Sequence, residues 1–189
     1  CRELGLALHL DGARLFNAAI ALDVPPANIA RHADTVTICL SKGLGCPLGA
    51  LVAGSAELMR TGRRYKHFFG GAMRQAGIVA AAGVYALEYH VDRLAEDHAR
   101  AKRLAEGLAE AGLPVELDDV ETNFVQLDVA PLGLTTTEAL ERLRQAGVGL
   151  SGTVHAATLR AVTHLDVNDD DIDRAIELAP RALGVLARA

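Results

Sequence analysis

Short apolar runs and segments of helical spacing alternate along the first half of the chain. The apolar runs are brief, and one of them is rich in β-branched residues, as is typical of buried strands. They span residues 6–10, 35–40 and 49–53. The segments between and after these runs predict helices over residues 15–22, 28–32 and 56–66.

The longest helical segment covers residues 75–111. It is rich in alanine and nearly all apolar up to Leu87, and then becomes amphipathic, with Leu94, Leu104 and Leu108 on one face. A helix that is apolar on every side is normally buried, so we expect the first part to be buried. We expect the amphipathic part to leave one lobe and cover another.

The second half predicts a compact α/β lobe over residues 88–189. The alternation in "FVQLDV" indicates a half-buried strand, and "VGLS" and "LRAVTHLDV" are typical of two further strands. "TTTEALERLRQAG" predicts a helix with a threonine cap and a terminal glycine. Residues 168–189 predict a closing helix whose first turn carries acidic residues, where the helix dipole favours them.

Composition narrows the classes of function. The net charge of -5 provides no basic patch for nucleic acid or anionic lipid. No segment is long and apolar enough to span a bilayer. Cysteines at three unrelated positions argue against a disulfide framework and against a zinc site, so no metal is expected and a reducing cytoplasm fits best.

One lysine, Lys42, stands inside the apolar stretch "TVTICLSKGLGCPLGALVAG". A buried ammonium is costly unless it is paired, neutralised or used covalently. From "SKG" alone, a lysine at a strand end whose ammonium reaches water is the simpler interpretation. Two features favour chemistry: nearby glycines permit close approach, and Asp11 follows another apolar strand, where α/β folds bind ligands. A desolvated lysine can form a Schiff base with an aldehyde, and an aspartate can hold a pyridinium proton.

Four segments carry a resemblance to a known family: "LHLDGARLFNAA", "TICLSKGLGCPLGALVAG", "GGAMRQAGIVAAAGVYAL" and "LRAVTHLDV". Together they resemble the low-specificity L-threonine aldolases, which are pyridoxal 5'-phosphate (PLP) enzymes of the aspartate aminotransferase fold type (fold type I), grouped with the β-eliminating lyases. The resemblance runs along essentially the whole chain, in the family's order. It implies an α/β fold and assembly as a homo-oligomer, either a dimer or a tetramer.

The resemblance also implies a division into domains. Residues 1–87 are expected to be the C-terminal part of a large PLP-binding domain with a mainly parallel sheet, and residues 88–189 a small C-terminal α/β domain. The chain begins at Cys1, in what reads as the interior of a domain. We therefore expect the C-terminal part of a longer polypeptide, in which the sheet of the large domain is incomplete without its first half.

Site residues follow from the same resemblance. It implies that Lys42 forms the Schiff base with PLP, and that Asp11 keeps the pyridine nitrogen protonated. Arg14 is implied as a ligand of the substrate carboxylate or of a cofactor hydroxyl, and Ser41 as a ligand of the cofactor phosphate. Arg160 is implied as the arginine of the small domain that binds the substrate carboxylate with its two-pronged guanidinium.

Taken by themselves, the residues leave simpler alternatives open. Arg14 could make surface ion pairs at a helix start, Arg160 could be an exposed strand charge, and Ser41 could finish its strand with a local backbone bond. His164 and His9 are interpreted as structural residues. Where the family commonly has a third glycine and a basic residue, this chain has Ala72 and the pair Lys66–His67, so the roles of these residues and of Arg74 stay open.

The implied reaction is the cleavage of L-threonine or L-allo-threonine to glycine and acetaldehyde. The same lysine and aspartate would also serve β-elimination, transamination or hydroxymethyl transfer in another fold-type-I enzyme. A further alternative is an inactive fragment or oligomerisation module that keeps the motifs and binds no cofactor. Neither the general base nor the preference between the two diastereomers follows from the sequence.

Overall fold

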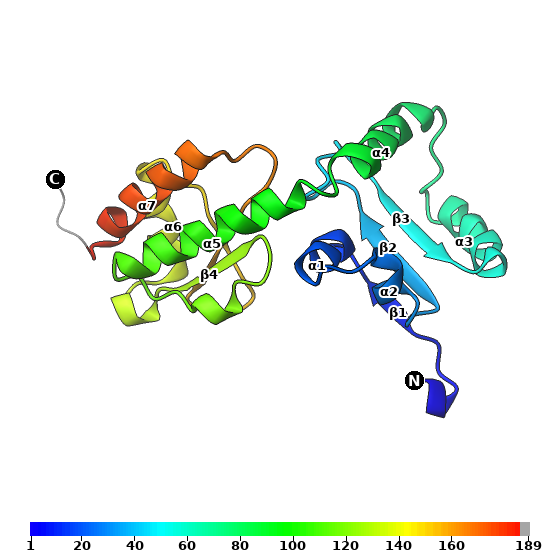
Figure 1. Ribbon diagram of the computed structural model, residues 1–189, viewed down its shortest axis with the longest axis horizontal. Helices are drawn as coiled ribbons and strands as arrows, with labels where there is room; N and C mark the ends of the chain where they lie inside the picture. The colour runs from blue at the N-terminus through cyan, green and yellow to red at the C-terminus, as the bar shows by residue number, and fades with distance from the viewer. Residues whose placement is uncertain (186–189) are drawn as a thin grey trace. The chain divides into compact units, whose positions relative to one another are not determined.

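A computed structural model describes residues 1–185 of the chain. It divides into two compact units, the first running from Cys1 to Leu94 and the second beginning at Ala95. The division falls within a helix, a few residues after the position expected from the sequence (Figure 1). In the part of the chain that the structure describes, no helix is long and apolar enough to cross a membrane.

The first unit contains a three-stranded sheet in the order β1-β2-β3. Its strands are β1 (His9–Asp11), β2 (Thr35–Cys39) and β3 (Ala50–Gly54). Strand β1 runs parallel to β2, whereas β3 runs antiparallel to it, so the expectation of a mainly parallel sheet is not met within the described residues. The reason is local: the chain returns from β2 to β3 through a short loop, and a parallel crossover needs a dozen or more residues.

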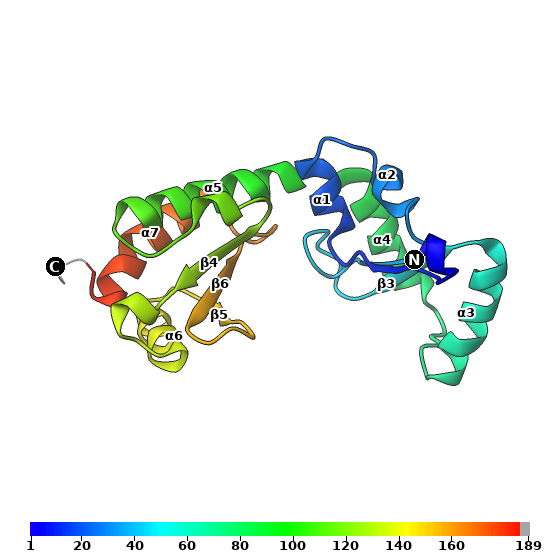
Figure 2. The same ribbon diagram turned by 90° about the horizontal axis from the view of Figure 1, so that it is seen from below.

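Five helical segments accompany this sheet. They are η1 (Arg2–Leu4), α1 (Leu15–Ala21), α2 (Pro26–Ala30), α3 (Ala56–Phe68) and α4 (Gly77–Tyr89). Helices α1 and α2 lie over one face of the sheet (Figures 1 and 2). The helices expected over residues 15–22, 28–32 and 56–66 are confirmed to within a few residues.

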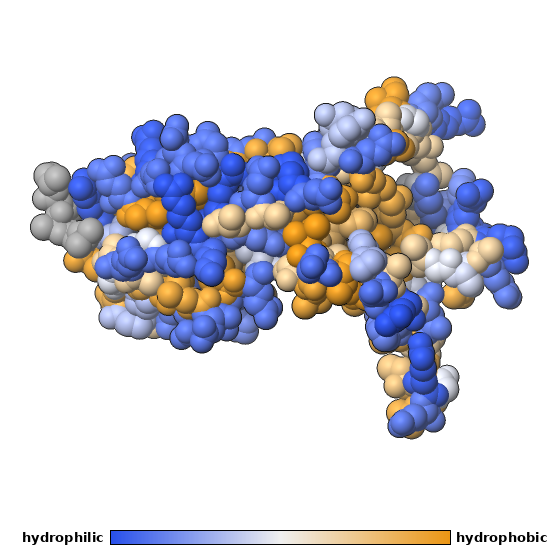
Figure 3. All heavy atoms as spheres, in the orientation of Figure 1, coloured by the Kyte–Doolittle hydropathy of each residue, from blue (hydrophilic) through white to orange (hydrophobic). Residues whose placement is uncertain are grey.

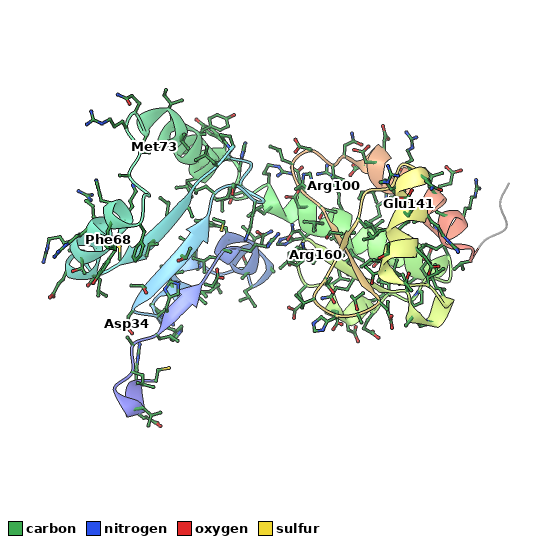
Figure 4. All side chains as sticks on the ribbon, turned by 180° about the vertical axis from the view of Figure 1, so that it is seen from behind. Asp34, Phe68, Met73, Arg100, Glu141 and Arg160 are labelled. Carbon is green, nitrogen blue, oxygen red and sulfur yellow. The ribbon has the colours of Figure 1, made fainter. Side chains whose placement is uncertain are left out.

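Polar side chains fix the start of the sheet. The backbone N–H of Leu8 donates to Asp34 Oδ2 at 2.7 Å, just ahead of both strands (Figure 4). The His9 ring lies between two hydroxyls of β2, with Nδ1 2.8 Å from Thr35 Oγ1 and Nε2 3.3 Å from Thr37 Oγ1. This register places Asp11 opposite Thr37, on the same sheet face as His9.

The buried core of the first unit is small. One cluster contains Leu40, Leu44, Cys46, Ala86 and Leu94. Leu15, Ala19 and Val36 are buried outside that cluster. Helix α4 is apolar on all sides, yet Ile78 is 81% exposed and only Gly83 and Ala86 are buried. The expectation that this helix is buried is therefore wrong for this chain, and every residue of β3 is exposed as well. Apolar side chains consequently reach the surface of this unit (Figure 3).

The second unit packs a small antiparallel sheet against three helices. The sheet has the order β4-β6-β5 and comprises β4 (Phe124–Asp128), β5 (Ser151–Gly152) and β6 (Thr158–Val162). The helices are α5 (Leu94–Glu110), α6 (Thr136–Gln145) and α7 (Asp169–Leu183), and two short turns, η2 (Leu117–Asp119) and η3 (Ala130–Leu132), complete the unit. Both expected helices and the strands β4 and β6 are present, although His164 lies beyond the end of β6. The strand expected at residues 148–151 is met only at Ser151, where β5 begins.

Its buried core is large and continuous. The fully buried members include Leu127, Leu143, Val125, Val129 and Leu159. Capping boxes start α6, from Thr135 with Glu138, and α7, from Asn168 with Asp171. Helix α7 ends at Leu183 because Gly184 takes the left-handed conformation, with φ 82°. The expected extension of this helix over residues 186–189 lies outside the described residues.

Candidate active site

Asp11 stands at the carboxyl end of β1, where its carboxylate is exposed. The backbone N–H of Ala13 donates to Asp11 Oδ1 at 3.2 Å, which closes a local turn after the strand. The turn lies close against β2, because a Cβ on Gly12 would stand 2.8 Å from Val36 Cγ2 and 3.0 Å from the Thr37 carbonyl oxygen. Glycine at position 12 therefore lets the backbone carry Asp11 along the edge of the neighbouring strand.

Lys42 follows the carboxyl end of β2, three residues after Cys39. Because β1 and β2 are parallel neighbours, Asp11 and Lys42 lie at the same end of the sheet, where the carboxyl ends of both strands meet. The Gly45 N–H donates to the Lys42 carbonyl at 2.8 Å, so residues 42–45 form a tight turn with φ 73° at Gly45. Lys42 itself is exposed, which corrects the expectation of a desolvated amine in this chain.

The turn behind Lys42 is anchored in the core. Leu44 and Cys46 are buried, and burial raises the pKa of the Cys46 thiol. That thiol is therefore a neutral packing group at ordinary pH. A Cβ on Gly43 would stand 2.8 Å from Leu94 Cδ2, so the turn can only lie this close to the core with glycine there.

A histidine that the sequence analysis did not single out also holds this turn. His90, directly after α4, donates from Nδ1 to the Leu44 carbonyl oxygen at 2.7 Å. The two residues are 46 positions apart, and the acceptor is a backbone group. No sequence motif marks such a contact, since any residue can supply a carbonyl.

Arg14 and Ser41 flank the same edge. Arg14 precedes α1 and is half-buried. Ser41 is exposed and lies next to Lys42 in the chain. The first unit thus gathers a carboxylate, an amine, a guanidinium and a hydroxyl at the end of two adjacent strands.

Arg160 lies on β6 of the second unit (Figure 4). It is half-buried, and its guanidinium carbon is 5.1 Å from the centroid of the Phe124 ring. Its Nε is buried and has no hydrogen-bond partner among the described residues. The alternative of an exposed strand charge is therefore not supported.

The basic residues whose roles the sequence leaves open lie in or after α3. Lys66 and His67 are exposed in its last turn, and His67 Nδ1 donates to the Arg63 carbonyl at 2.8 Å. Arg74 is exposed in the segment before α4. His67 therefore makes a local hydrogen bond within its own helix, and Arg74 lies next to Met73 in the surface segment before α4. Within the described residues, no cluster of histidine, cysteine and acidic side chains could hold a metal ion.

Comparison with known proteins finds similarity to one enzyme family and to named members of it. The sequence model of the beta-eliminating lyase family matches residues 1–130. The low specificity L-threonine aldolase of Escherichia coli K12 is 41% identical over 190 residues, covering 99% of this chain and 53% of that protein. The low-specificity L-threonine aldolase 1 of Arabidopsis thaliana is 38% identical, covering 95% of this chain and 50% of that protein.

A solved structure supports the fold. The threonine aldolase of Leishmania major aligns with a TM-score of 0.75 at 22% identity, covering 97% of this chain and 54% of that chain. At this identity the alignment shows the α/β fold alone. The chain spans about half the length of the curated relatives it matches.

Proposed function

Because the chain belongs to the beta-eliminating lyase family, we propose that it provides the cofactor-binding lysine and aspartate of a PLP-dependent aldehyde-lyase. The substrates would be β-hydroxy-α-amino acids such as L-threonine and L-allo-threonine, and the products glycine and an aldehyde. One observation carries the proposal: adjacent parallel strands bring Asp11 and Lys42 to the same edge of one sheet. Similarity to the low-specificity threonine aldolases supports the choice of substrate class.

The donor set fits PLP. A primary amine is the group that binds an aldehyde, and Lys42 offers one on a turn anchored by buried Leu44. A carboxylate is the group that holds a pyridine nitrogen protonated, and Asp11 carries one, whose Oδ1 accepts from the Ala13 amide at 3.2 Å. Arg14 and Ser41 add a cation and a hydroxyl for the anionic or polar groups of the cofactor. When bound, PLP supplies a ring that accepts the electron pair of a breaking bond at Cα.

The chain's own residues would then bind, orient and move protons. Asp11 holds the ring-nitrogen proton by charge, and the Gly12 turn holds Asp11 in place. Lys42 Nζ would carry a proton to Cα of the substrate, as its primary amine is a competent general acid and base. The β-hydroxyl loses one proton and Cα gains one as the Cα–Cβ bond breaks, so the four-carbon substrate gives glycine and acetaldehyde with no redox partner.

Arg160 is proposed to bind the substrate carboxylate. Its guanidinium is half-buried and lies over the Phe124 ring, which restricts its orientation. A guanidinium can bind a carboxylate through two parallel hydrogen bonds, and such fixed binding orients the Cα–Cβ bond. Lysine would keep the charge but lose this geometry.

A cleavage assay tests the proposal. Glycine and acetaldehyde are measured from L-threonine and L-allo-threonine, with this chain alone and with the unmatched half of the Escherichia coli relative supplied as a second polypeptide. We expect Lys42→Ala to abolish cleavage and the matched control Lys66→Ala to retain it. Cleavage that survives Lys42→Ala, or none in either arrangement, would reject the proposal.

A further inference from the structure

The Leu44 carbonyl is held by a side chain from far along the sequence. His90 Nδ1 lies 2.7 Å from this oxygen. A carbonyl oxygen only accepts hydrogen bonds, so Nδ1 must carry a hydrogen. This is true of the protonated ring and of one of the two neutral tautomers, and the contact therefore does not require charge.

The Leu44 carbonyl shares a peptide plane with the Gly45 N–H. That N–H donates to the Lys42 carbonyl at 2.8 Å and closes the turn that carries Lys42. Because a peptide unit is rigid and planar, fixing its oxygen also fixes the direction of its N–H. His90 thereby sets the orientation of the hydrogen bond that ends on Lys42.

Side-chain packing alone does not supply this restraint. Burial of the Leu44 side chain fixes where the turn rests against the core. Glycines on both sides of Leu44, one of them at φ 73°, leave the neighbouring peptide planes free to rotate about their Cα atoms. A hydrogen bond to the carbonyl is the restraint that resists such rotation.

His90 is itself well fixed. Its backbone N–H donates to the Ala86 carbonyl at 2.8 Å, and Ala86 belongs to the same buried cluster as Leu44. Its ring stands edge-on to Tyr85, with centroids 5.3 Å apart and planes at 87°. The contact thus connects the end of α4 rigidly to the turn.

From these contacts we infer that His90 is a positioning residue for Lys42, acting through the peptide plane between Leu44 and Gly45. It does not touch the reacting atoms. Its importance for catalysis rests on the proposed function of Lys42, whereas its hold on the turn does not. The experiments below separate the two.

The first test determines the tautomer of His90 in the unaltered chain. Nitrogen-15 NMR of the uniformly labelled chain distinguishes the tautomers of neutral histidines, and His90→Asn identifies the His90 signals by their loss. We expect the Nδ1–H tautomer for His90 at a pH where the ring is neutral. The Nε2–H tautomer would overturn the inference, since Nδ1 could not then donate to Leu44.

Hydrogen–deuterium exchange of residues 42–46 measures the restraint directly. His90→Asn and His90→Leu are matched in shape, and only asparagine keeps an N–H two bonds beyond Cβ, as Nδ1 is in histidine. We expect His90→Leu to speed exchange at the Gly45 and Cys46 amides about three- to tenfold, the effect of losing one hydrogen bond. Asparagine should restore slow exchange, and the exposed control His32→Leu should leave it unchanged.

Unchanged exchange in His90→Leu would overturn the inference. If the leucine variant fails to fold, the tautomer assignment decides alone. The functional readout is the rate at which Lys42 forms a borohydride-stable adduct with PLP, which should fall several-fold in His90→Leu and recover in His90→Asn. Absence of any adduct at Lys42 in the unaltered chain would reject the proposed function, and the exchange and tautomer results would still stand or fall independently.

Discussion

The two units bury their apolar residues to very different extents. The second unit covers one face of its sheet with helices and has a continuous core, in which Leu127, Leu143 and Leu159 are all but inaccessible to solvent. The first unit has eight buried apolar residues, of which five form one cluster, and it leaves β3 and most of α4 exposed, although their sequences are just as apolar. An apolar pattern in the sequence therefore predicts that a surface is buried in a contact. It does not predict that the segment packed against this surface lies in the same stretch of chain.

This difference in burial coincides with the positions of the candidate site residues. The proposed cofactor residues all lie in the poorly covered first unit, at the end of a sheet with one parallel and one antiparallel neighbour. The proposed substrate-binding residue Arg160 lies in the well-packed second unit. The predictions that follow test this contrast, beginning with the largest effect.

The largest difference between the two units is expected when each is made as a separate fragment. A fragment of residues 95–189 is expected to unfold cooperatively in urea, because its core is formed by its own elements. A fragment of residues 1–94 is expected to unfold without a cooperative transition or to aggregate, because its exposed apolar area is large relative to its core. Circular dichroism and light scattering measure both. A cooperative, monomeric first fragment would contradict the contrast.

Truncating one apolar side chain in each unit compares how much each side chain contributes to the free energy of unfolding. Leu143→Ala, at a fully buried site of α6, should cost about 2–5 kcal/mol of unfolding free energy, as is typical of a cavity in a packed core. Ile78→Ala on α4, where the side chain is 81% exposed, should change it by less than about 0.5 kcal/mol. Urea midpoints of the full chain measure both changes. Equal costs would show that Ile78 is buried in solution.

Two helical glycines should respond in opposite directions. A Cβ on Gly107 of α5 would lie 2.6 Å from Ile176 Cδ1, so Gly107→Ala should destabilise by about 1 kcal/mol despite better helix propensity. Gly62 of α3 has nothing within 4 Å, so Gly62→Ala should stabilise by about 0.5–1 kcal/mol. Thermal and urea unfolding would measure both, and a stabilising Gly107→Ala would mean that α5 and α7 pack loosely.

The smallest expected effect is a pH dependence at the start of α6. Hydrogen bonds from the Thr135 backbone N–H and hydroxyl lower the pKa of Glu138. A carboxyl whose pKa is lower in the folded state adds stability that is complete above its unfolded pKa, about 4.3, and is lost as the pH falls through the folded value. The stability difference between the chain and Glu138→Gln should therefore shrink in acid. A difference that is constant from pH 7 to pH 3 would contradict the prediction.

Much of the fold could be predicted because the signals are local. Thr135 with Glu138 and Asn168 with Asp171 carry the starts of α6 and α7 in a few adjacent residues. The β-branched residues of β2 and its turn glycines are equally local. The break between α4 and α5 at residues 90–93 was not predicted, since it contains neither glycine nor proline.

The candidate site was predictable in its residues but not in its environment. The positions of Asp11 and Lys42 after neighbouring strands follow from their sequence context. The exposure of Lys42 does not, because it depends on which surfaces face each other and not on the apolar residues beside it in the chain. The His90 contact was invisible for the related reason that its partner is a backbone carbonyl.

A reductive trap tests the central claim most directly. The chain has three lysines, Lys42, Lys66 and Lys102, so a PLP adduct can be assigned without ambiguity. The chain, alone and with the unmatched half of a relative, is incubated with PLP, reduced with borohydride, digested and mapped by mass spectrometry. We predict an adduct concentrated at Lys42 and missing from Lys42→Ala. Label spread evenly over the three lysines in both arrangements, and unchanged at Lys66 and Lys102 in the variant, would contradict the claim that Lys42 is the cofactor lysine.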